Sequence, residues 1–130
     1  GAPAAMAYCH CGSCRQWSAG PVNAFTLWPP DGFKITRGAD NIGAYDKTAA
    51  TENQVGPSNR KWCKTCGGHV YIDHPTVGVV DIPAVLIKDF KFEPGFHVHY
   101  QETVLPMKDG LPKFKDLPEA AGGSGEELTE

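Results

Sequence analysis

The chain has 130 residues, 15 acidic and 12 basic side chains, a formal net charge of −3 and a hydrophobic fraction of 41%. This length suits one domain with its own core. The acidic balance excludes a bulk electrostatic attraction to nucleic acid, and no apolar run approaches the ~20 residues that span a membrane. No signal peptide is visible, so we expect a cytoplasmic protein without a nucleic-acid or membrane partner.

Short β-prone segments separated by Gly and Pro turns occupy most of the chain. Strands are expected at 22–28, 33–36, 42–45, 69–73, 77–87 and 97–101. The 77–87 strand should bend at Pro83, because proline has no amide hydrogen for a sheet ladder. Residues 1–8 are expected as an extended approach, 15–21 as a turn or one helical turn, and 46–59 as a loop. Many short strands without a strongly amphipathic helix predict an all-β fold of small stacked antiparallel sheets.

The last segment of the chain has a different composition. Residues 119–130 contain four glutamates and a Gly-Gly-Ser-Gly run. Such a segment has too little apolar surface to offset the entropy of ordering. We therefore expect one domain at 1–118 and a disordered acidic tail at 119–130.

All five cysteines fall into two clusters. Cys9, Cys11 and Cys14 form a C-x-C-x-x-C motif, and Cys63 and Cys66 begin a C-x-x-C-G-G motif. Clusters this tight suit a thiophilic metal, because a short loop can bring several sulfur atoms to one point. A sulfur-only donor set favours Zn²⁺ over harder ions, and an iron–sulfur cluster would normally require a fourth thiolate of comparable spacing. We expect all five cysteines to be metal ligands.

Disulfide bonding and redox catalysis are the alternative interpretations of these cysteines. An odd cysteine count, in a chain long enough for its own core, disfavours structural disulfides. A redox C-x-x-C pair usually begins a helix, whereas residues 67–73 have the pattern of a strand. Metal binding is therefore favoured over redox chemistry, and redox chemistry over disulfides.

Several polar residues admit two roles each. His10 is either a proton shuttle or outer hydrogen-bond donor to the metal site, or a polar loop residue. Arg15 either binds a carboxylate of the substrate or adds positive charge beside the thiolates. His97 and His99 alternate onto one strand face and suit surface or sheet-pair roles better than metal ligation. Asp81, in the apolar 77–87 strand, is either a satisfied bulge residue or an acid of the site.

Several segments match one known pattern together. They are Cys9-His10-Cys11-Gly12-Ser13-Cys14-Arg15, Pro30-Asp31-Gly32-Phe33, Thr36-Arg37-Gly38, Cys63-Lys64-Thr65-Cys66-Gly67-Gly68, the loop 89–96, His97 with His99, and Leu111-Pro112-Lys113-Phe114. Over roughly residues 5–118 the chain resembles the glutathione-dependent formaldehyde-activating family, which includes the domain of centromere protein V. The resemblance implies a β-tent fold, zinc, and carbon–sulfur chemistry on a glutathione adduct. It also implies that Cys9, Cys11 and Cys14 hold an exchangeable, catalytic zinc.

One departure from the family pattern concerns the second cysteine pair. Family members usually carry a further C-x-C motif upstream of the triplet, and it shares a structural zinc with the downstream C-x-x-C. Only eight residues precede Cys9, and none is a cysteine. We therefore expect a clipped sequence without that strand, in which Cys63 and Cys66 are two thiolates short of a complete site.

Two functional hypotheses follow. The first is a zinc-dependent carbon–sulfur lyase, similar to S-(hydroxymethyl)glutathione synthase, because three protein thiolates leave one vertex of a tetrahedral zinc open for a glutathione-type thiol. The second is a non-catalytic zinc scaffold or binding domain of the same fold. Lability of the metal in the presence of free thiol distinguishes the two, since a closed structural site would not exchange it.

Overall fold

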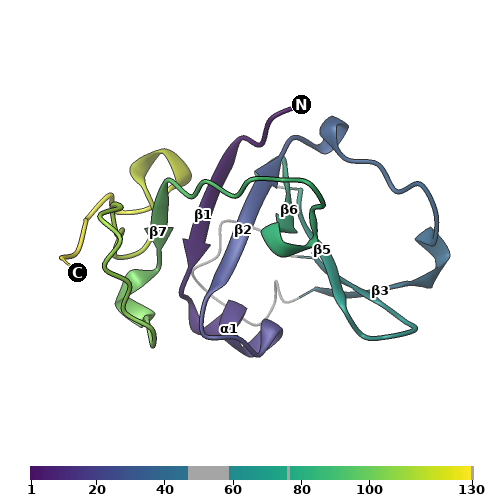
Figure 1. Cartoon of the computed structure of the whole chain (residues 1–130), viewed down its shortest axis with the longest axis horizontal. Helices are drawn as coiled ribbons and strands as arrows, with labels where there is room; N and C mark the ends of the chain where they lie inside the picture. Colours follow the sequence, from purple (N-terminus) through teal and green to yellow (C-terminus); the bar gives the residue numbers. More distant parts are fainter. Residues whose placement is uncertain (47–58, 76, 130) are drawn as a thin grey trace. The chain divides into compact units, whose positions relative to one another are not determined.

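A computed structural model describes residues 1–46, 59–75 and 77–129, which contain seven strands and one α-helix (Figure 1). This predominance of strands confirms the predicted all-β class. The chain divides into two compact units. The first unit comprises Gly1–Ala4 and Thr26–Lys88, and the second comprises Ala5–Phe25 and Asp89–Glu130. None of the described helices has the length and apolar character needed to cross a membrane.

The first unit is built on antiparallel strands that neighbour one another in chain order. They are β3 (Ile42–Asp46), β4 (Asn59–Cys63), β5 (His69–His74) and β6 (Val79–Pro83). Arg60, Ile72 and Asp81 stand opposite one another on β4, β5 and β6. Directly paired residues of neighbouring strands point to the same face, so these three side chains form one row. The row is buried in the core of this unit.

Gly43 marks a close approach of a ring to the backbone in the first unit. Gly43 pairs with Trp62 across β3 and β4, and a Cβ atom added to Gly43 would overlap the Trp62 ring. Only a residue without a side chain lets the indole lie against the strand at this point. In the same unit, the rings of Phe33 and Tyr71 pack with centroids 4.6 Å apart.

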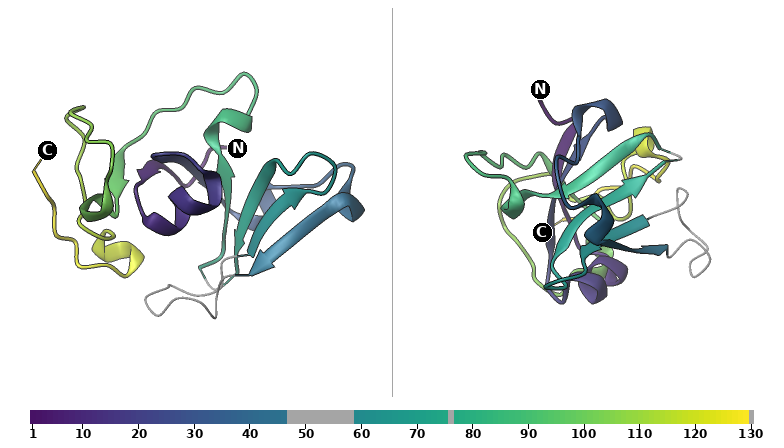
Figure 2. Two further views of the ribbon diagram at one scale, coloured as in Figure 1. Left: turned by 90° about the horizontal axis from the view of Figure 1, so that it is seen from below. Right: turned by 90° about the vertical axis from the view of Figure 1, so that its right-hand side faces the viewer.

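The second unit contains β1 (Ala5–Cys9), the helix α1 (Gly12–Ser18) and β7 (Phe96–Val98). β1 and β7 are paired in parallel, with Cys9 opposite Val98. This pair differs from the predicted antiparallel pairing. A long stretch of chain separates the two strands, and such a connection lets the second strand return in the same direction. α1 follows β1 after only two residues (Figure 2).

The β2 strand (Asn23–Trp28) begins in the second unit and ends in the first. Within the first unit, Thr26 Oγ1 donates a hydrogen bond of 2.7 Å to the carbonyl oxygen of Ile82 on β6. Trp28 Nε1 in turn donates to Thr26 Oγ1 at 2.7 Å. The fully buried Thr26 hydroxyl is therefore satisfied as both donor and acceptor.

The predicted strands at 22–28, 42–45 and 69–73 are confirmed as β2, β3 and β5. The 77–87 strand ends at Pro83, and a 3₁₀ helix (Ala84–Leu86) follows, as expected for a proline that cannot continue the ladder.

The strand predicted at 33–36 is wrong, because alternation reports which side chains are buried and not whether the backbone has a partner. Most of the loop predicted at 46–59 lies outside the described residues.

The C-terminal segment differs from the disordered tail predicted at 119–130. Phe114 pairs with Glu127, and the Leu128 amide donates a hydrogen bond of 2.7 Å to the Lys113 carbonyl oxygen. A 3₁₀ helix (Glu119–Ala121) lies between these contacts in the sequence. Figure 2 shows the C-terminal segment, in yellow, beside the green part of the second unit. Composition measures apolar content and cannot register a backbone partner, which explains the difference. A domain boundary at residue 118 stays a prediction.

Candidate metal centre

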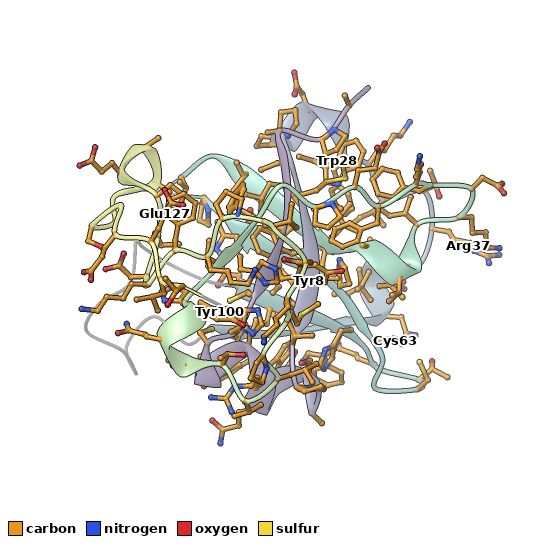
Figure 3. The ribbon with its side chains drawn as sticks, turned by 60° about the vertical axis from the view of Figure 1, so that its left-hand side comes forward. Tyr8, Trp28, Arg37, Cys63, Tyr100 and Glu127 are labelled. Carbon is orange, nitrogen blue, oxygen red and sulfur yellow. The ribbon has the colours of Figure 1, made fainter. Side chains whose placement is uncertain are left out.

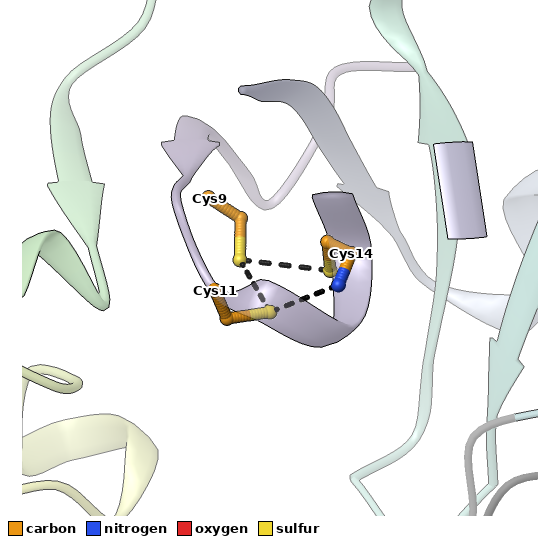
Figure 4. Close-up of side chains that lie close together, drawn as sticks. All are labelled: Cys9, Cys11 and Cys14. Atoms are coloured by element: carbon orange, nitrogen blue, oxygen red, sulfur yellow. Dashed lines mark hydrogen bonds between the residues drawn. The ribbon is translucent and has the colours of Figure 1, made fainter. Parts of the chain in front are cut away.

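The end of β1 and the start of α1 bring Cys9, Cys11 and Cys14 together (Figure 4). Cys9 is the last residue of the strand, and Cys11 is the N-cap of the helix. The Cys14 amide donates a hydrogen bond of 3.3 Å to Cys11 Sγ. A sulfur atom thus takes the capping position that Ser, Thr, Asp or Asn usually fills. The local fold of six residues is sufficient to converge the three side chains.

The geometry of the three sulfur atoms fits a metal ion. All three lie within 4.8 Å of one another, with Cys9 Sγ 3.4 Å from Cys11 Sγ and 3.6 Å from Cys14 Sγ. A tetrahedral zinc with Zn–S bonds of about 2.3 Å would separate its sulfur ligands by roughly 3.8 Å. The cluster could therefore hold a metal ion with little rearrangement. Across residues 1–46, 59–75 and 77–129, this is the one group of three His, Cys, Asp or Glu side chains with such geometry.

The three thiols do not share charge equally. Hydrogen bonds with Cys11 and Cys14 raise the pKa of Cys9, and its burial raises it further. Hydrogen bonds from Cys14 and Cys9 lower the pKa of Cys11 well below its ordinary value, and the Cys14 amide adds to this. The two pKa values move in opposite directions, so Cys11 loses its proton before Cys9 does. An arriving cation would therefore meet a thiolate at Cys11.

His10, between the first two cysteines, is fully buried and uses both ring nitrogens. Its Nε2 lies 2.8 Å from Nδ1 of His97, and its Nδ1 lies 2.8 Å from Oγ1 of Thr103. Burial lowers the pKa of His10 to about 4, and the positive charges of Lys113 and Arg15 lower it as well. His10 is therefore a neutral, doubly hydrogen-bonded residue and not an exposed loop residue.

His97 continues the chain of contacts to two residues that the sequence did not mark as functional. His97 Nε2 lies 2.7 Å from Asp109 Oδ2, and Lys113 Nζ donates a hydrogen bond of 2.8 Å to Asp109 Oδ1. Burial acts to raise the pKa of Asp109, but the hydrogen bonds from Lys113 and His97 outweigh it and hold the pKa below its ordinary value. The one available signal was the spacing of Asp109 and Lys113, four residues apart.

Arg15 and Glu102 hold the backbone of the loop at His10 and at Gly12. Arg15 Nε donates a hydrogen bond of 3.1 Å to the His10 carbonyl oxygen. Glu102 Oε1 accepts a hydrogen bond of 2.9 Å from the Gly12 amide at the start of α1. Arg15 therefore stabilises the loop that it was predicted to complement by charge.

His97 and His99 do not share one strand face. β7 ends at Val98, and His99 takes a left-handed conformation with φ of 53°. His99 Nδ1 lies 3.7 Å from Glu102 Oε2 and its side chain is 23% exposed, whereas the His97 side chain is fully buried. The sequence predicts strand alternation through residue 101, but the left-handed turn at His99 interrupts this alternation. A sheet-pair role holds for His97, which lies opposite Tyr8 of β1.

Cys63 and Cys66 lie in the first unit, in the turn that joins β4 to β5. The Cys63 amide donates to the Gly68 carbonyl and the Gly67 amide to the Cys63 carbonyl, both at 2.8 Å. Gly67 has a φ of 76°, the conformation expected of a knuckle glycine. Backbone N–H groups of Cys66 and Thr65 lower the pKa of Cys63. Metal ligation by this pair stays a prediction.

All five cysteines are free thiols in the structure.

The sequence model of one family, the glutathione-dependent formaldehyde-activating enzyme, matches residues 1–102. Among solved structures, a crystal structure of a Rhodobacter sphaeroides protein is similar at 18% identity and a TM-score of 0.47, over 68% of this chain and 72% of that chain. A similarity this low establishes neither fold nor function. The search of curated proteins gives no match to the sequence.

Proposed function

The chain belongs to the glutathione-dependent formaldehyde-activating family, and on that premise we propose that it is a zinc-dependent carbon–sulfur lyase. Its substrate would be the adduct of glutathione and formaldehyde, S-hydroxymethylglutathione. The observation that carries the proposal is the convergence of three thiols within 4.8 Å at the junction of β1 and α1. Family membership thus supports the substrate class, and the sulfur donor set of the loop supports the metal chemistry.

Cys9, Cys11 and Cys14 are the residues that would hold the zinc. Three sulfur donors leave one position of a tetrahedral ion for a small ligand, which is typical of catalytic and not of closed structural zinc sites. When bound there, zinc would supply the positive charge that lowers the pKa of a glutathione thiol from its usual value of about 8.5. A thiolate anion is the form of glutathione that attacks a carbonyl carbon.

The reaction needs no oxidant or reductant. In the direction of adduct formation, a bond forms between the glutathione sulfur and the formaldehyde carbon, and the carbonyl π electrons move to the oxygen. The proton that leaves the thiol is balanced by one taken up at that oxygen, giving a hydroxymethyl group. The lyase direction breaks the same carbon–sulfur bond and returns the proton to sulfur.

The protein's own residues would keep the loop ready for this chemistry. The Cys14 amide stabilises a thiolate at Cys11, whose pKa is lowered by the hydrogen bonds around it. Arg15, bound to the His10 carbonyl, brings a positive charge to the loop, where it offsets the anionic sulfur cluster and is available to a glutathione carboxylate. These contacts orient groups before substrate binds, which is where a positioned site gains rate.

A non-catalytic zinc scaffold is the second candidate, and the burial of Cys9 favours it. Cys9 is only 7% exposed, and a ligand this buried is usual where zinc stabilises a fold. The difference between the candidates lies at the fourth zinc position. A scaffold closes it with protein, and a lyase leaves it to a thiol.

Cobalt-substituted protein tests the proposal, because thiolate–cobalt charge-transfer bands report each added sulfur ligand. We expect millimolar glutathione to change the bands and S-methylglutathione, which has no thiol, to leave them unchanged. Exchange of ¹³C-formaldehyde with glutathione, followed by NMR, should be faster with zinc-loaded protein than with Cys11→Ser protein, and Ser124→Ala, remote from the loop, serves as the control. Unchanged bands with cobalt still bound would mean a closed site and would favour the scaffold.

A further inference from the structure

A continuous line of hydrogen bonds, buried at its centre and part-buried at both ends, connects the cysteine loop to a distant part of the second unit. It runs from Thr103 Oγ1 to His10 Nδ1 (2.8 Å), from His10 Nε2 to His97 Nδ1 (2.8 Å), and from His97 Nε2 to Asp109 Oδ2 (2.7 Å). Both histidine rings have no exposed surface. None of these residues belongs to the sulfur cluster, and the proposed chemistry uses none of them directly.

Charge at the far end fixes the direction of every bond in the line. Asp109 Oδ1 accepts from Lys113 Nζ at 2.8 Å and from the Leu111 amide at 3.1 Å, so the carboxylate is ionised and can only accept. His97 must then carry its proton on Nε2. One ammonium and one carboxylate already balance each other here, so a second positive charge on the buried His97 would be costly.

The tautomer of His97 in turn determines which ring nitrogen of His10 carries the proton. A neutral His97 protonated on Nε2 has a bare Nδ1, which must accept a proton from His10 Nε2. His10 Nδ1 is then bare and accepts from the Thr103 hydroxyl. The Leu105 amide donates to the same hydroxyl oxygen at 3.1 Å, which agrees with a Thr103 proton pointing toward His10. Asp109 thus selects the tautomers of two histidines, one of which lies between two cysteines.

Ring contacts keep the two imidazoles from turning out of the line. Tyr8 stacks on His97 with centroids 4.9 Å apart, and Tyr100 meets His10 edge-on at 4.8 Å (both tyrosines are labelled in Figure 3). The backbone of His10 is held as well, by its amide hydrogen bond of 3.1 Å to the Val98 carbonyl oxygen. A side chain restrained at the ring and at the backbone transmits its position to its neighbours along the chain.

We propose that Asp109 and His97 are positioning residues for the metal centre: they orient His10, and His10 holds the Cys9–Cys11 segment so that three sulfurs converge before metal binds. The inference rests on the proposed function only in taking Cys9, Cys11 and Cys14 as metal ligands. Direct outer partners of metal ligands typically change affinity by roughly 10- to 100-fold. Asp109 acts through two intervening residues, so the expected loss of metal affinity is about 10-fold.

The test compares two Asp→Asn variants of the second unit. Asp109→Asn gives His97 a neighbour that can either donate or accept, so the tautomer is no longer selected. Asp116→Asn makes the same chemical change at an acid that caps the Ser124 turn, where Asp116 Oδ1 accepts from the Ser124 hydroxyl at 2.8 Å, outside the line. The first readout is ¹⁵N NMR of the histidine side chains in metal-free protein. Wild type and Asp116→Asn should show only Nε2–H tautomers at His10 and His97, and Asp109→Asn a mixture.

Two further measurements connect the line to the loop. The amides of Cys14 and Arg15 bond to Cys11 Sγ and to the Cys11 carbonyl oxygen, and their hydrogen exchange should become about 10-fold faster in Asp109→Asn only. Cobalt affinity at the triplet should fall about 10-fold in the same variant. His97→Gln, whose amide can still donate to Asp109, should lose less affinity than His97→Phe.

The outcomes separate this proposal from the proposed function. Unchanged tautomers and unchanged exchange rates in Asp109→Asn would overturn it, whatever the enzyme does, as would an Nδ1–H tautomer at His10 in wild type. If tautomers and exchange rates change as expected while glutathione leaves the cobalt bands unaltered, the positioning line stands and the lyase fails. Both NMR readouts use metal-free wild type as reference, so they remain decisive if a variant binds no metal.

Discussion

The two units of the molecule treat a carboxylic acid in opposite ways. In the first unit, burial raises the pKa of Asp81 to about 7 against the pull of Arg60, and Asp81 Oδ1 has no hydrogen-bond partner among the described residues. In the second unit, Lys113 and His97 outweigh the effect of burial and lower the pKa of Asp109. The difference teaches that the partners supplied by the fold, and not the residue type, decide whether an acid is charged.

The two cysteine clusters differ in the same way. The triplet is connected through His10 to the buried His97 and the half-buried Thr103, which lie far away in the sequence. The Cys63–Cys66 turn is held mainly by backbone hydrogen bonds within six residues, with Asn41 as a further partner, and Cys66 is exposed. A locally built turn suits a site that needs only a fixed shape. A loop supported from a distance suits a site whose geometry must persist when its ligands change.

The largest expected effect is on the pH dependence of stability in the first unit. Native Asp81, with a pKa of about 7, holds a proton that the unfolded state releases near the ordinary value of 3.8. The native state therefore binds more protons between these values, and stability falls as pH rises through this window, by roughly 4 kcal/mol at most. Asp81→Asn stays neutral and should remove most of this fall in the free energy of unfolding, measured with urea from pH 4 to pH 8.

Asp40→Asn provides the control for that experiment, because it makes the same change at an exposed position in a short 3₁₀ helix. It should keep the wild-type pH profile. Identical profiles for Asp81→Asn and wild type would show that Asp81 finds a partner in solution, and the contrast with Asp109 would then fail.

Loss of one sulfur from the triplet has the next largest expected effect. Cys11→Ser removes the thiol with the lowered pKa, and we expect cobalt affinity at the triplet to fall at least about 100-fold, or ~2.7 kcal/mol. Cys66→Ser, in the locally built turn, should leave that affinity within about 2-fold. Thiolate–cobalt absorption during a metal titration measures both. If Cys11→Ser unfolds the protein, the triplet is structural, and the lyase loses its main support.

The packing of the first unit is tested by adding one methyl group. Gly43→Ala places a Cβ where the Trp62 ring lies, and overpacking of this kind costs about 2 kcal/mol in the free energy of unfolding. Gly95→Ala, in the second unit, meets only the Met6 carbonyl oxygen at 3.9 Å and should cost much less. Urea denaturation of both variants gives the comparison. Equal losses would mean that the cost comes from glycine's backbone freedom and not from the ring.

The smallest expected effect concerns the Cys63–Cys66 turn. Asn41 Nδ2 donates a hydrogen bond of 2.8 Å to Thr65 Oγ1 at an exposed position. The backbone bond from the Lys64 amide to the Asn41 carbonyl oxygen persists in Asn41→Ala. We expect a loss of about 0.5 kcal/mol in the free energy of unfolding. A loss several times larger would show that side chains, and not the backbone, hold this turn.

Much of the fold and part of the site could be predicted from the sequence. The strands at 42–45 and 69–73, the bend at Pro83 and the grouping of Cys9, Cys11 and Cys14 depend on residues close together in the chain. Local steric preferences and short-range spacing suffice for such features. The sequence predicts a turn or one helical turn at 15–21, whereas the helix spans Gly12–Ser18. Its start could not be predicted, because Gly12 and Ser13 are weak helix formers and a cysteine is an unusual N-cap.

By itself, therefore, the sequence determined the β-rich class, the family and the sulfur donor set of the candidate metal centre. Tertiary structure alone decided that β1 pairs in parallel with β7, that His97 is buried while His99 turns away, and that Asp109 reaches His10 through His97. It also gave the acidic C-terminal segment a backbone partner. The physical reason is separation along the chain. Burial and hydrogen-bond partners are supplied by residues about 90 positions away, and no local pattern encodes which of many polar side chains will meet.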